Sequence, residues 1–322
     1  MKKCVIIMNP NSGKKKKIKT YEKFYDLSRK YGYDLEIIFT ERKGHAIEIM
    51  KELPNDIDLV LSGGGDGTLN EIVTGNISRE KKLVIAPLPL GSTNDVGSMY
   101  GLDKSIYENY EMILKGQPKS IDICYINDTP FVYVACFGDY LDLAYSTPRA
   151  LKEKYGKLAY IFYGLKQLKN KLHHYNIKYT IDGVEHEGTY SFIFITNSSR
   201  IAGQNDVYYD IKLDDDKFEV AFANINSKKE VFKLLVLINS IEIKDIPGVD
   251  YFQTNNLKIE FSEEPNISWG IDGEEFISKE KVYEFRMEKN MKMQVPKGSI
   301  KKLFKDWGVI WKKEKKCQKR KN

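Results

Sequence analysis

Gly63-Gly64-Gly65-Asp66-Gly67-Thr68-Leu69-Asn70 stands between an apolar run that predicts a strand and a segment that predicts a helix. Glycine lets the backbone approach a phosphate closely and point its N–H groups at it. A helix that begins near Thr68 adds the positive end of its dipole, and Asp66 lies where a magnesium-linked carboxylate is needed. No Gly-Lys-Ser/Thr follows, so this is not a Walker A loop. We interpret the segment as a phosphate-binding turn rather than a simple reversal of the chain.

The flanking sequence alternates strand and helix signals over about the first 120 residues. Strands are predicted over residues 4–8, 34–39, 58–61 and 83–86, and helices over 18–31, 45–53 and from 69 onward. Such alternation predicts a parallel sheet covered by helices on both faces. Ligands of these sheets bind at the carboxyl ends of the strands, which is where the glycine segment lies.

The pattern changes after Asp122. Short segments rich in β-branched and aromatic residues follow, separated by turn signals, at 131–137, 174–181, 189–196, 218–224, 256–261 and 282–287. They predict an antiparallel sandwich, interrupted by helical stretches at 158–171 and 229–237. We therefore predict an α/β domain followed by a β-rich domain.

Three further polar segments follow or interrupt predicted strands. Asn9-Pro10-Asn11-Ser12-Gly13 repeats the order of strand, polar turn and helix, and the run Lys14–Lys17 after it is either a solvated face or a source of positive charge for a phosphate. A capped turn would explain Ser92, Thr93 and Asn94 in the segment Gly91–Asp95. It does not explain Asp95, which we expect to join Asp66 at the same edge of the sheet. Asp122, inside an apolar run, is either an edge residue or a third inward carboxylate. Together these carboxylates suit Mg²⁺.

Charge and cysteine content indicate which partners, metal sites and compartment to expect. The net charge of +6 is concentrated at the C-terminus: residues 297–322 hold eleven basic and two acidic residues, a balance of +9, which leaves −3 for the rest. We therefore expect no nucleic-acid partner. No two of the four cysteines have C-x-x-C spacing, which argues against a zinc site and for a reducing compartment. No apolar run reaches the ~18 residues of a membrane span, so we expect a cytoplasmic protein.

The C-terminal segment has helical periodicity. Apolar residues recur along one predicted face, with lysines on much of the other: Ile300, Leu303, Phe304, Trp307 and Trp311. One interpretation is an interfacial helix on an anionic membrane, and the other is a helix docked on the protein itself. For Lys312–Lys321 we expect attraction to the membrane.

In their order, these segments resemble the bacterial diacylglycerol kinase family, soluble lipid kinases related to sphingosine kinases. The resemblance rests on motifs spread along nearly the whole chain: Asn9–Gly13, Thr40, Gly64–Asn70, Gly91–Asp95, Ile121–Ile123, Leu213–Asp215 and Asp272–Glu274. It implies a nucleotide-binding domain like those of phosphofructokinases and NAD kinases over residues 1–125, completed by a returning segment 290–311. It also implies a β-rich lipid-substrate domain over 126–289 and a basic tail over 312–322, and it suggests a homodimer.

The resemblance also implies an activity and its residues. ATP is expected along Asn9, Pro10, Asn11, Ser12, Gly13, Thr40, Gly64, Gly65, Asp66, Gly67, Thr68, Leu69, Asn70 and Ser92, with Mg²⁺ held through water by Asp66, Asp95 and Asp122. The γ-phosphate then passes to a lipid hydroxyl, with diacylglycerol the leading acceptor and phosphatidic acid the product. Taken alone, Asp272-Gly273 reads as a hairpin turn. By resemblance Asp272 and Glu274 are candidate bases, and we favour Asp272, with Glu274 in the magnesium network.

A second, structural magnesium ion is implied at the turn Leu213-Asp214-Asp215-Asp216, with the Asp215 carboxylate and the carbonyls of Lys212 and Lys217 as ligands. Asp216 stands where relatives usually have glycine, and aspartate tolerates positive φ better than most residues. Three alternatives stay open. The first is a kinase for another lipid alcohol, such as phosphatidylglycerol or a sphingoid base. The second is an NAD kinase, and the third is a non-catalytic nucleotide- or membrane-binding module. As a lipid kinase, the protein is expected at the inner face of the membrane.

Overall fold

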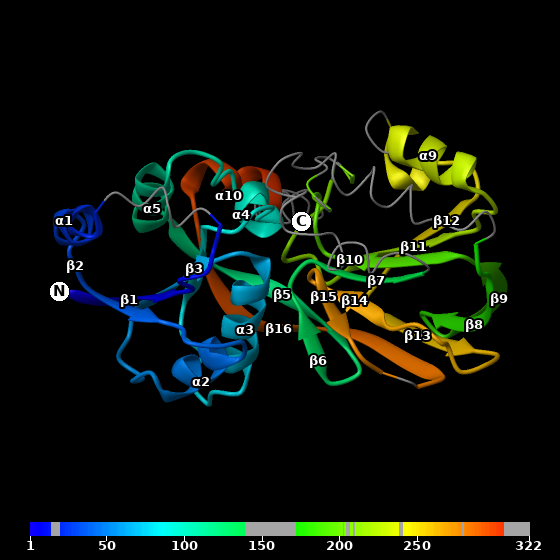
Figure 1. Ribbon diagram of the computed structural model, residues 1–322, viewed down its shortest axis with the longest axis horizontal. Coiled ribbons are helices and arrows are strands. Elements are labelled where there is room, and N and C mark those ends of the chain that lie inside the picture. The colour runs from blue at the N-terminus through cyan, green and yellow to red at the C-terminus, as the bar shows by residue number, and fades with distance from the viewer. Residues whose placement is uncertain are drawn as a thin grey trace, which may run out of the picture.

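The computed structural model describes residues 1–13, 20–138, 172–201, 203, 207–208, 210–237, 241–278 and 280–305. The predicted Lys14–Lys17 run, the helical stretch 158–171, Trp307, Trp311 and the tail 312–322 lie outside the described residues. Two units lie side by side along the longest axis, with the N-terminus at the far end of the first unit (Figure 1).

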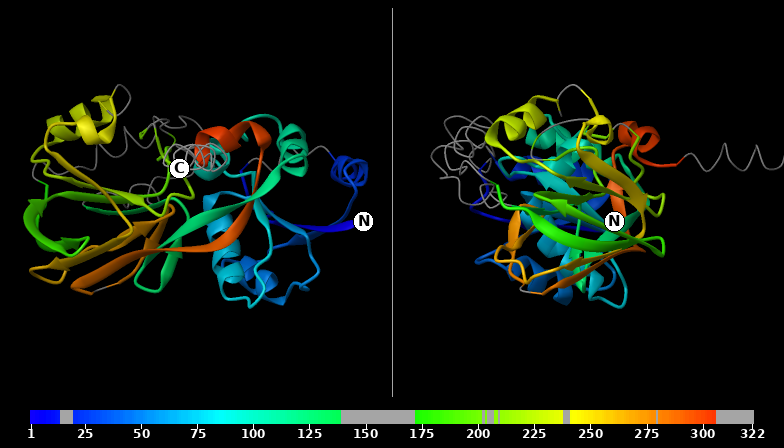
Figure 2. Two further views of the ribbon diagram at one scale, coloured as in Figure 1. Left: turned by 180° about the vertical axis from the view of Figure 1, so that it is seen from behind. Right: turned by 90° about the vertical axis from the view of Figure 1, so that its right-hand side faces the viewer.

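The first unit is built on four parallel strands in the order β2-β1-β3-β4: β1 (Lys2–Met8), β2 (Tyr33–Phe39), β3 (Leu59–Gly64) and β4 (Ile85–Pro89). Helices α1 (Glu22–Lys30) and α5 (Ile106–Leu114) cover one face, while α2 (His45–Glu52) and α3 (Asp66–Ile77) cover the other (Figures 1 and 2). The short α4 (Asp95–Met99) follows β4. This arrangement confirms the predicted α/β class. Since β1 lies between β2 and β3, the crossovers diverge there, at the usual ligand edge of such a sheet.

The second unit is a sandwich of antiparallel strands, as predicted. One sheet has the order β12-β11-β10-β7-β14-β15, formed by β7 (Val134–Gly138), β10 (Phe192–Thr196), β11 (Phe218–Ala223), β12 (Val249–Thr254), β14 (Trp269–Ile271) and β15 (Glu274–Phe276). The facing strands are β8 (Tyr175–Ile181), β9 (Val184–Tyr190), β13 (Asn256–Phe261) and β16 (Val282–Val295). Aromatic side chains of both sheets fill the space between them, among them Phe137, Phe261 and Trp269. Helix α9 (Lys228–Leu237) and the 3₁₀ turn Ile243–Asp245 complete this unit.

One long strand joins the two units and corrects the predicted segmentation. The strand predicted at 282–287 and the start of the returning segment 290–311 form a single strand, β16, with a register shift between Lys289 and Met291. This shift is a β-bulge, and the strand continues through it. β16 pairs with β5 (Gln117–Ile126), which in turn pairs with β6 (Thr129–Phe131).

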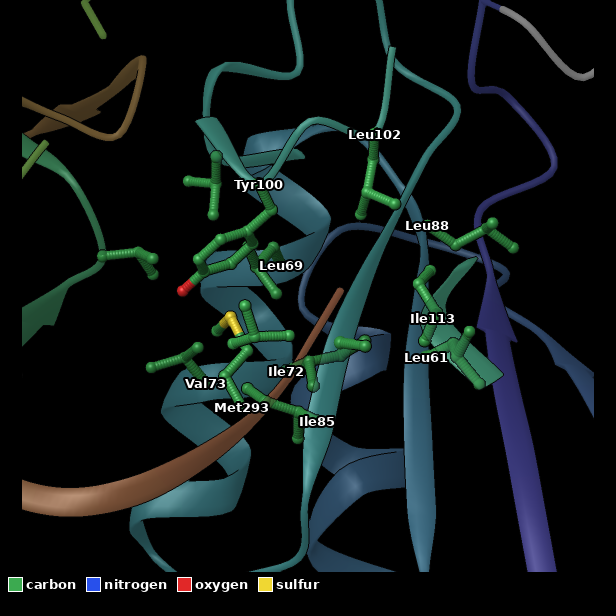
Figure 3. Packing of buried hydrophobic residues seen from close by; sticks show 14 of the residues in the cluster. Leu61, Leu69, Ile72, Val73, Ile85, Leu88, Tyr100, Leu102, Ile113 and Met293 are labelled. Atoms are coloured by element: carbon green, nitrogen blue, oxygen red, sulfur yellow. The ribbon is translucent and has the colours of Figure 1, made fainter. Parts of the chain in front are cut away.

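The return of β16 completes the core of the first unit. Met293 lies opposite Ile85 of β4 and packs among Ile72 and Val73 of α3 (Figure 3). Leu69, the one large apolar residue of the glycine segment, packs into the same core (Figure 3).

Helix α10 (Lys297–Leu303) docks on the protein itself over its described length. Leu303 and Phe304 are buried, and the Leu303 carbonyl accepts a hydrogen bond from the N–H of Leu213 at 2.8 Å. Of the two interpretations of the apolar face, docking therefore holds for these two residues, because their side chains are part of the core. In the described part of the chain, no helix is long and apolar enough to span a membrane.

Candidate functional site

The glycine segment forms a sharp strand-to-helix junction. β3 runs through Gly64 and α3 begins at Asp66, two residues before the predicted start, so that Gly65 alone connects them. A Cβ at Gly64 would lie 2.3 Å from Oγ1 of Thr68, and one at Gly91 would lie 2.5 Å from the Cα of Gly65. Only glycine can be accommodated at these two close contacts. They allow α3 to begin directly after β3, so that the N–H groups of its first turn lie at the edge of the sheet.

The loop after β1 is braced against that helix. The Asn9 side-chain oxygen accepts a hydrogen bond from the N–H of Asn11 at 2.9 Å, and its amide group lies 3.4 Å from Oγ1 of Thr68 as a donor. Both loops at the carboxyl edge are thus fixed relative to each other. Such fixed donors suit an anionic ligand.

A pocket of about 570 Å³ opens at this edge and is lined by both units. Eight of the predicted nucleotide-binding and catalytic residues line it: Asn9, Asn11, Thr40, Gly65, Gly67, Thr68, Asn70 and Glu274. Eight others do not contribute to its wall: Pro10, Ser12, Gly13, Gly64, Asp66, Leu69, Ser92 and Asp272.

Sequence reasoning missed several lining residues. Arg42 and Lys43 belong to the loop that follows Thr40, while Pro130 and Phe276 come from the second unit. The polar loop after the second predicted strand was a usable signal for the first two. No local signal marks the other two, because they reach the pocket through the packing of the two units.

Asp66 and Asp95 meet at the edge of the sheet, as predicted. The Asp66 carboxylate accepts hydrogen bonds from the N–H groups of Asp95 and Val96, at 2.9 and 3.2 Å. Burial, together with the nearby Asp95 charge, raises the pKa of Asp66 to about 7. The Asp95 carboxylate in turn receives Nε of Arg200 and the N–H of Gly203, both at 2.9 Å. Arg200 is a site residue that the sequence did not point to.

Asp122 is tied instead to the turn predicted to hold a structural magnesium ion. Its Oδ2 accepts the N–H of Asp216 at 2.7 Å, and its own N–H donates to the Leu213 carbonyl at 2.7 Å. Burial raises the pKa of Asp122 to about 6.

The turn itself fits a hard cation. Asp216 has φ 65°, the left-handed conformation that favours glycine. Oδ1 of Asp215 is buried with no hydrogen-bond partner. In the described residues, no three His, Cys, Asp or Glu side chains gather closely enough to hold a metal by themselves. Ligation by one carboxylate and two backbone carbonyls, as predicted here, is compatible with that finding.

Asp272 sits in the predicted hairpin turn and is fully engaged. It has φ 50°, precedes Gly273 at φ 83°, and is 3% exposed. Its carboxylate accepts four hydrogen bonds, from the N–H groups of residues 132, 133 and 134 and from the Asn70 amide. Burial raises the pKa of Asp272, and these donors act in the opposite direction.

These bonds explain why the strand predicted over 131–137 is divided. The N–H groups of Val132 and Tyr133 turn toward the Asp272 carboxylate instead of a neighbouring strand, so β6 ends at Phe131 and β7 begins at Val134. A carboxylate has about four lone-pair sites, and here all four are used.

Glu274 lies at the pocket with its side chain more than half exposed. Its Oε2 forms an ion pair with Nζ of Lys43 at 2.8 Å, and its Oε1 lies 3.4 Å from the position of a Cβ on Gly67, in the first turn of α3. The second unit thus brings a carboxylate to the helix terminus of the first.

Known proteins match both the sequence and this fold. A family model described as the diacylglycerol kinase catalytic domain matches residues 3–126. A diacylglycerol kinase of Staphylococcus haemolyticus is 30% identical over 277 residues, covering 85% of this chain and 83% of the relative. One of Staphylococcus aureus is 27% identical over 274 residues, covering 85% and 86%. A solved putative diacylglycerol kinase from Bacillus anthracis aligns with a TM-score of 0.76 over 93% of this chain and 99% of that one, at 22% identity, which shows the fold.

Proposed function

This chain belongs to the diacylglycerol kinase family and is a lipid kinase, and we propose that it transfers the γ-phosphoryl group of ATP to the hydroxyl of diacylglycerol. The observation that carries the proposal is the pocket in which the N-terminus of α3 faces Glu274 of the second unit. Phosphoryl transfer requires phosphate donors on one side and a proton acceptor for the hydroxyl on the other.

The nucleotide's phosphates are proposed to bind at the junction of β3 and α3. The N–H groups at Gly65, Gly67 and Thr68 are oriented by the helix and are not consumed by a side-chain cap. Asn9 and Thr40 close the same edge from the neighbouring strands. Donors held in this way cost little reorganisation when charge develops on the phosphate.

We assign the base to Glu274 rather than to Asp272, which the sequence favoured. All four lone-pair sites of Asp272 accept hydrogen bonds from the protein, so it has none to offer a substrate hydroxyl. Glu274 is exposed to the pocket, and its Oε2 accepts a hydrogen bond from Nζ of Lys43. In this assignment Asp272 positions the hairpin that carries Glu274.

Magnesium, when bound, neutralises charge on the phosphate oxygens. Asp66 and Asp95 are proposed to hold the catalytic ion through water, and Asp215 with the carbonyls of Lys212 and Lys217 the structural ion. The acidic pair at the sheet edge supports the first site, and the unpartnered Asp215 oxygen supports the second. Asp122 connects the structural turn to β5 and is proposed to act on the catalytic ion only through that turn.

The acceptor lies in a membrane, so the enzyme has to work at a surface. The eleven basic residues of the segment 297–322 supply attraction to an anionic leaflet. We propose that the protein associates peripherally with the cytoplasmic side of the membrane. The lysines of α10 are exposed, while Leu303 is buried and Ile300 half-buried, which supports a mainly electrostatic contact at that helix.

Labelled ATP tests the function directly. Purified protein with Mg²⁺ and γ-labelled ATP is given diacylglycerol, phosphatidylglycerol or sphingosine in mixed micelles, with NAD in parallel. Label in phosphatidic acid is the expected result. Label in another lipid would keep the lipid kinase and replace the acceptor, whereas label in NADP alone would refute the proposed reaction.

A further inference from the structure

Lys43 and Glu274 form a charged bridge across the pocket. Lys43 lies in the loop between β2 and α2, and Glu274 begins β15, 231 residues later in the sequence. Their side chains are 80% and 57% exposed, and the Nζ–Oε2 distance is 2.8 Å. Exposed ion pairs of this kind contribute at most about 1 kcal/mol to stability, so fold stability does not account for the bridge.

The loop that carries Lys43 is fixed on the helix that faces the pocket. The Glu71 carboxylate, on α3, accepts hydrogen bonds from the N–H groups of Gly44 at 2.9 Å and Ala46 at 3.2 Å. Lys43 is therefore held beside the first turn of α3, and its ammonium group reaches over the pocket. Its neighbour Arg42 is instead directed to Glu48 at 2.6 Å.

The charge around the pocket makes this lysine important. Among the described lining residues, four carry carboxylates and two carry cations, a balance of −2: Glu41, Glu71, Glu274, Glu275, Arg42 and Lys43. A polyphosphate that binds in a pocket of net negative charge is repelled by the carboxylates, so its binding depends on the two cations. The Glu274 carboxylate lies where that anion would lie, between Lys43 and the N-terminus of α3.

We propose that Lys43 binds the terminal phosphates of the nucleotide, and that Glu274 takes the place of those phosphates before the nucleotide binds. The arriving phosphate displaces the carboxylate from the ammonium group and from the helix terminus. Glu274 is then released next to the phosphoryl group, where the base is needed. This inference rests on the proposed function, since it assumes that the ligand is a nucleotide.

Calorimetric binding without lipid tests the exchange. With Mg²⁺ present, the wild type and Lys43→Met are titrated with AMP and with a non-hydrolysable ATP analogue. A charge-assisted contact to the outer phosphates predicts that Lys43→Met weakens binding of the ATP analogue about 10- to 100-fold. AMP lacks those phosphates, so its affinity should change less than about two-fold. Lys43→Arg should restore much of the loss, because it keeps the charge.

Glu274→Gln supplies the opposite change. Removal of the competing carboxylate should leave Lys43 available and tighten binding of the ATP analogue several-fold. Lys3→Met is the matched control: Lys3 also forms an exposed ion pair, with Asp56, but on the first strand away from the pocket. It should leave both affinities unchanged.

Two results would overturn the inference while leaving the kinase intact: equal losses for AMP and the ATP analogue in Lys43→Met, or weaker analogue binding in Glu274→Gln. A wild type that binds neither nucleotide would refute the proposed function itself, and the inference with it.

Discussion

Replacing Asp272 by asparagine tests whether this residue holds the hairpin that carries Glu274 or is itself the base. Its Oδ1 accepts the N–H groups of Tyr133 and Val134 at 3.0 and 3.2 Å. Its Oδ2 accepts the N–H of Val132 and the Asn70 amide, both at 2.7 Å. The substitution turns one of these oxygens into an NH₂ group, which cannot accept. Two hydrogen bonds are therefore lost in either orientation of the new amide.

The expected loss of stability is large. A hydrogen bond to a charged group contributes about 1.5–3 kcal/mol, so the loss of two predicts a decrease of about 3–6 kcal/mol in the free energy of unfolding. Proteins are usually stable by only about 5–15 kcal/mol. Urea unfolding followed by circular dichroism should show a clearly lower midpoint for Asp272→Asn.

Glu274→Gln is the contrasting variant. Its exposed side chain and surface ion pair predict a change in unfolding free energy of less than about 1 kcal/mol. Loss of a general base predicts that kcat falls about 10²- to 10⁴-fold. Labelled-ATP assays on both variants, beside the unfolding curves, complete the comparison. If Asp272→Asn kept native stability and lost as much turnover as Glu274→Gln, Asp272 would be the base and the assignment would be wrong.

Three further predictions follow from packing and charge. Gly91→Ala should weaken ATP binding, because a Cβ there would lie 2.5 Å from the Cα of Gly65, whereas Gly298→Ala, with open space around it, should bind ATP normally. Burial raises the pKa of Glu219 to about 8, so the contribution of this side chain to stability is complete below its unfolded pKa near 4.5 and is lost as the pH rises to about 8. Glu219→Gln should therefore raise the melting temperature more at pH 8 than at pH 5. An equal gain at both pH values would refute this. Truncation after Lys305 should weaken binding to anionic vesicles, whereas truncation after Ser299 also removes the buried side chains of Leu303 and Phe304 and should destabilise the protein.

Local sequence patterns predicted the sheet of the first unit, although they missed the helices α4 and α5. The alternation of strands and helices predicted the parallel sheet, and the carboxyl ends of its strands brought Asp66 and Asp95 together as expected. These features depend on contacts between neighbouring elements, which periodicity and turn chemistry report.

Contacts between distant segments were not predictable in the same way. Lys43 and Arg200 acquire their partners only when the two units pack, and neither lies in a motif. Asp272 was interpreted either as a turn residue or as a base, yet it is a turn residue whose carboxylate also organises the backbone of 132–134. Leu303 and Phe304 had helical periodicity, but the pattern did not specify which surface they would cover.

The continuous pairing of β5 with β16 bears on how the pocket can move. The two strands stay in register from Phe285 opposite Ile126 to Val295 opposite Gln117, apart from one bulge, and so carry sheet structure from one unit into the other. Relative rotation of the units would have to twist this ladder, which resists bending more strongly than a flexible linker does. We therefore expect ligand entry to be accommodated by the exposed side chains of Lys43 and Glu274, with the two sheets acting as one stiff frame.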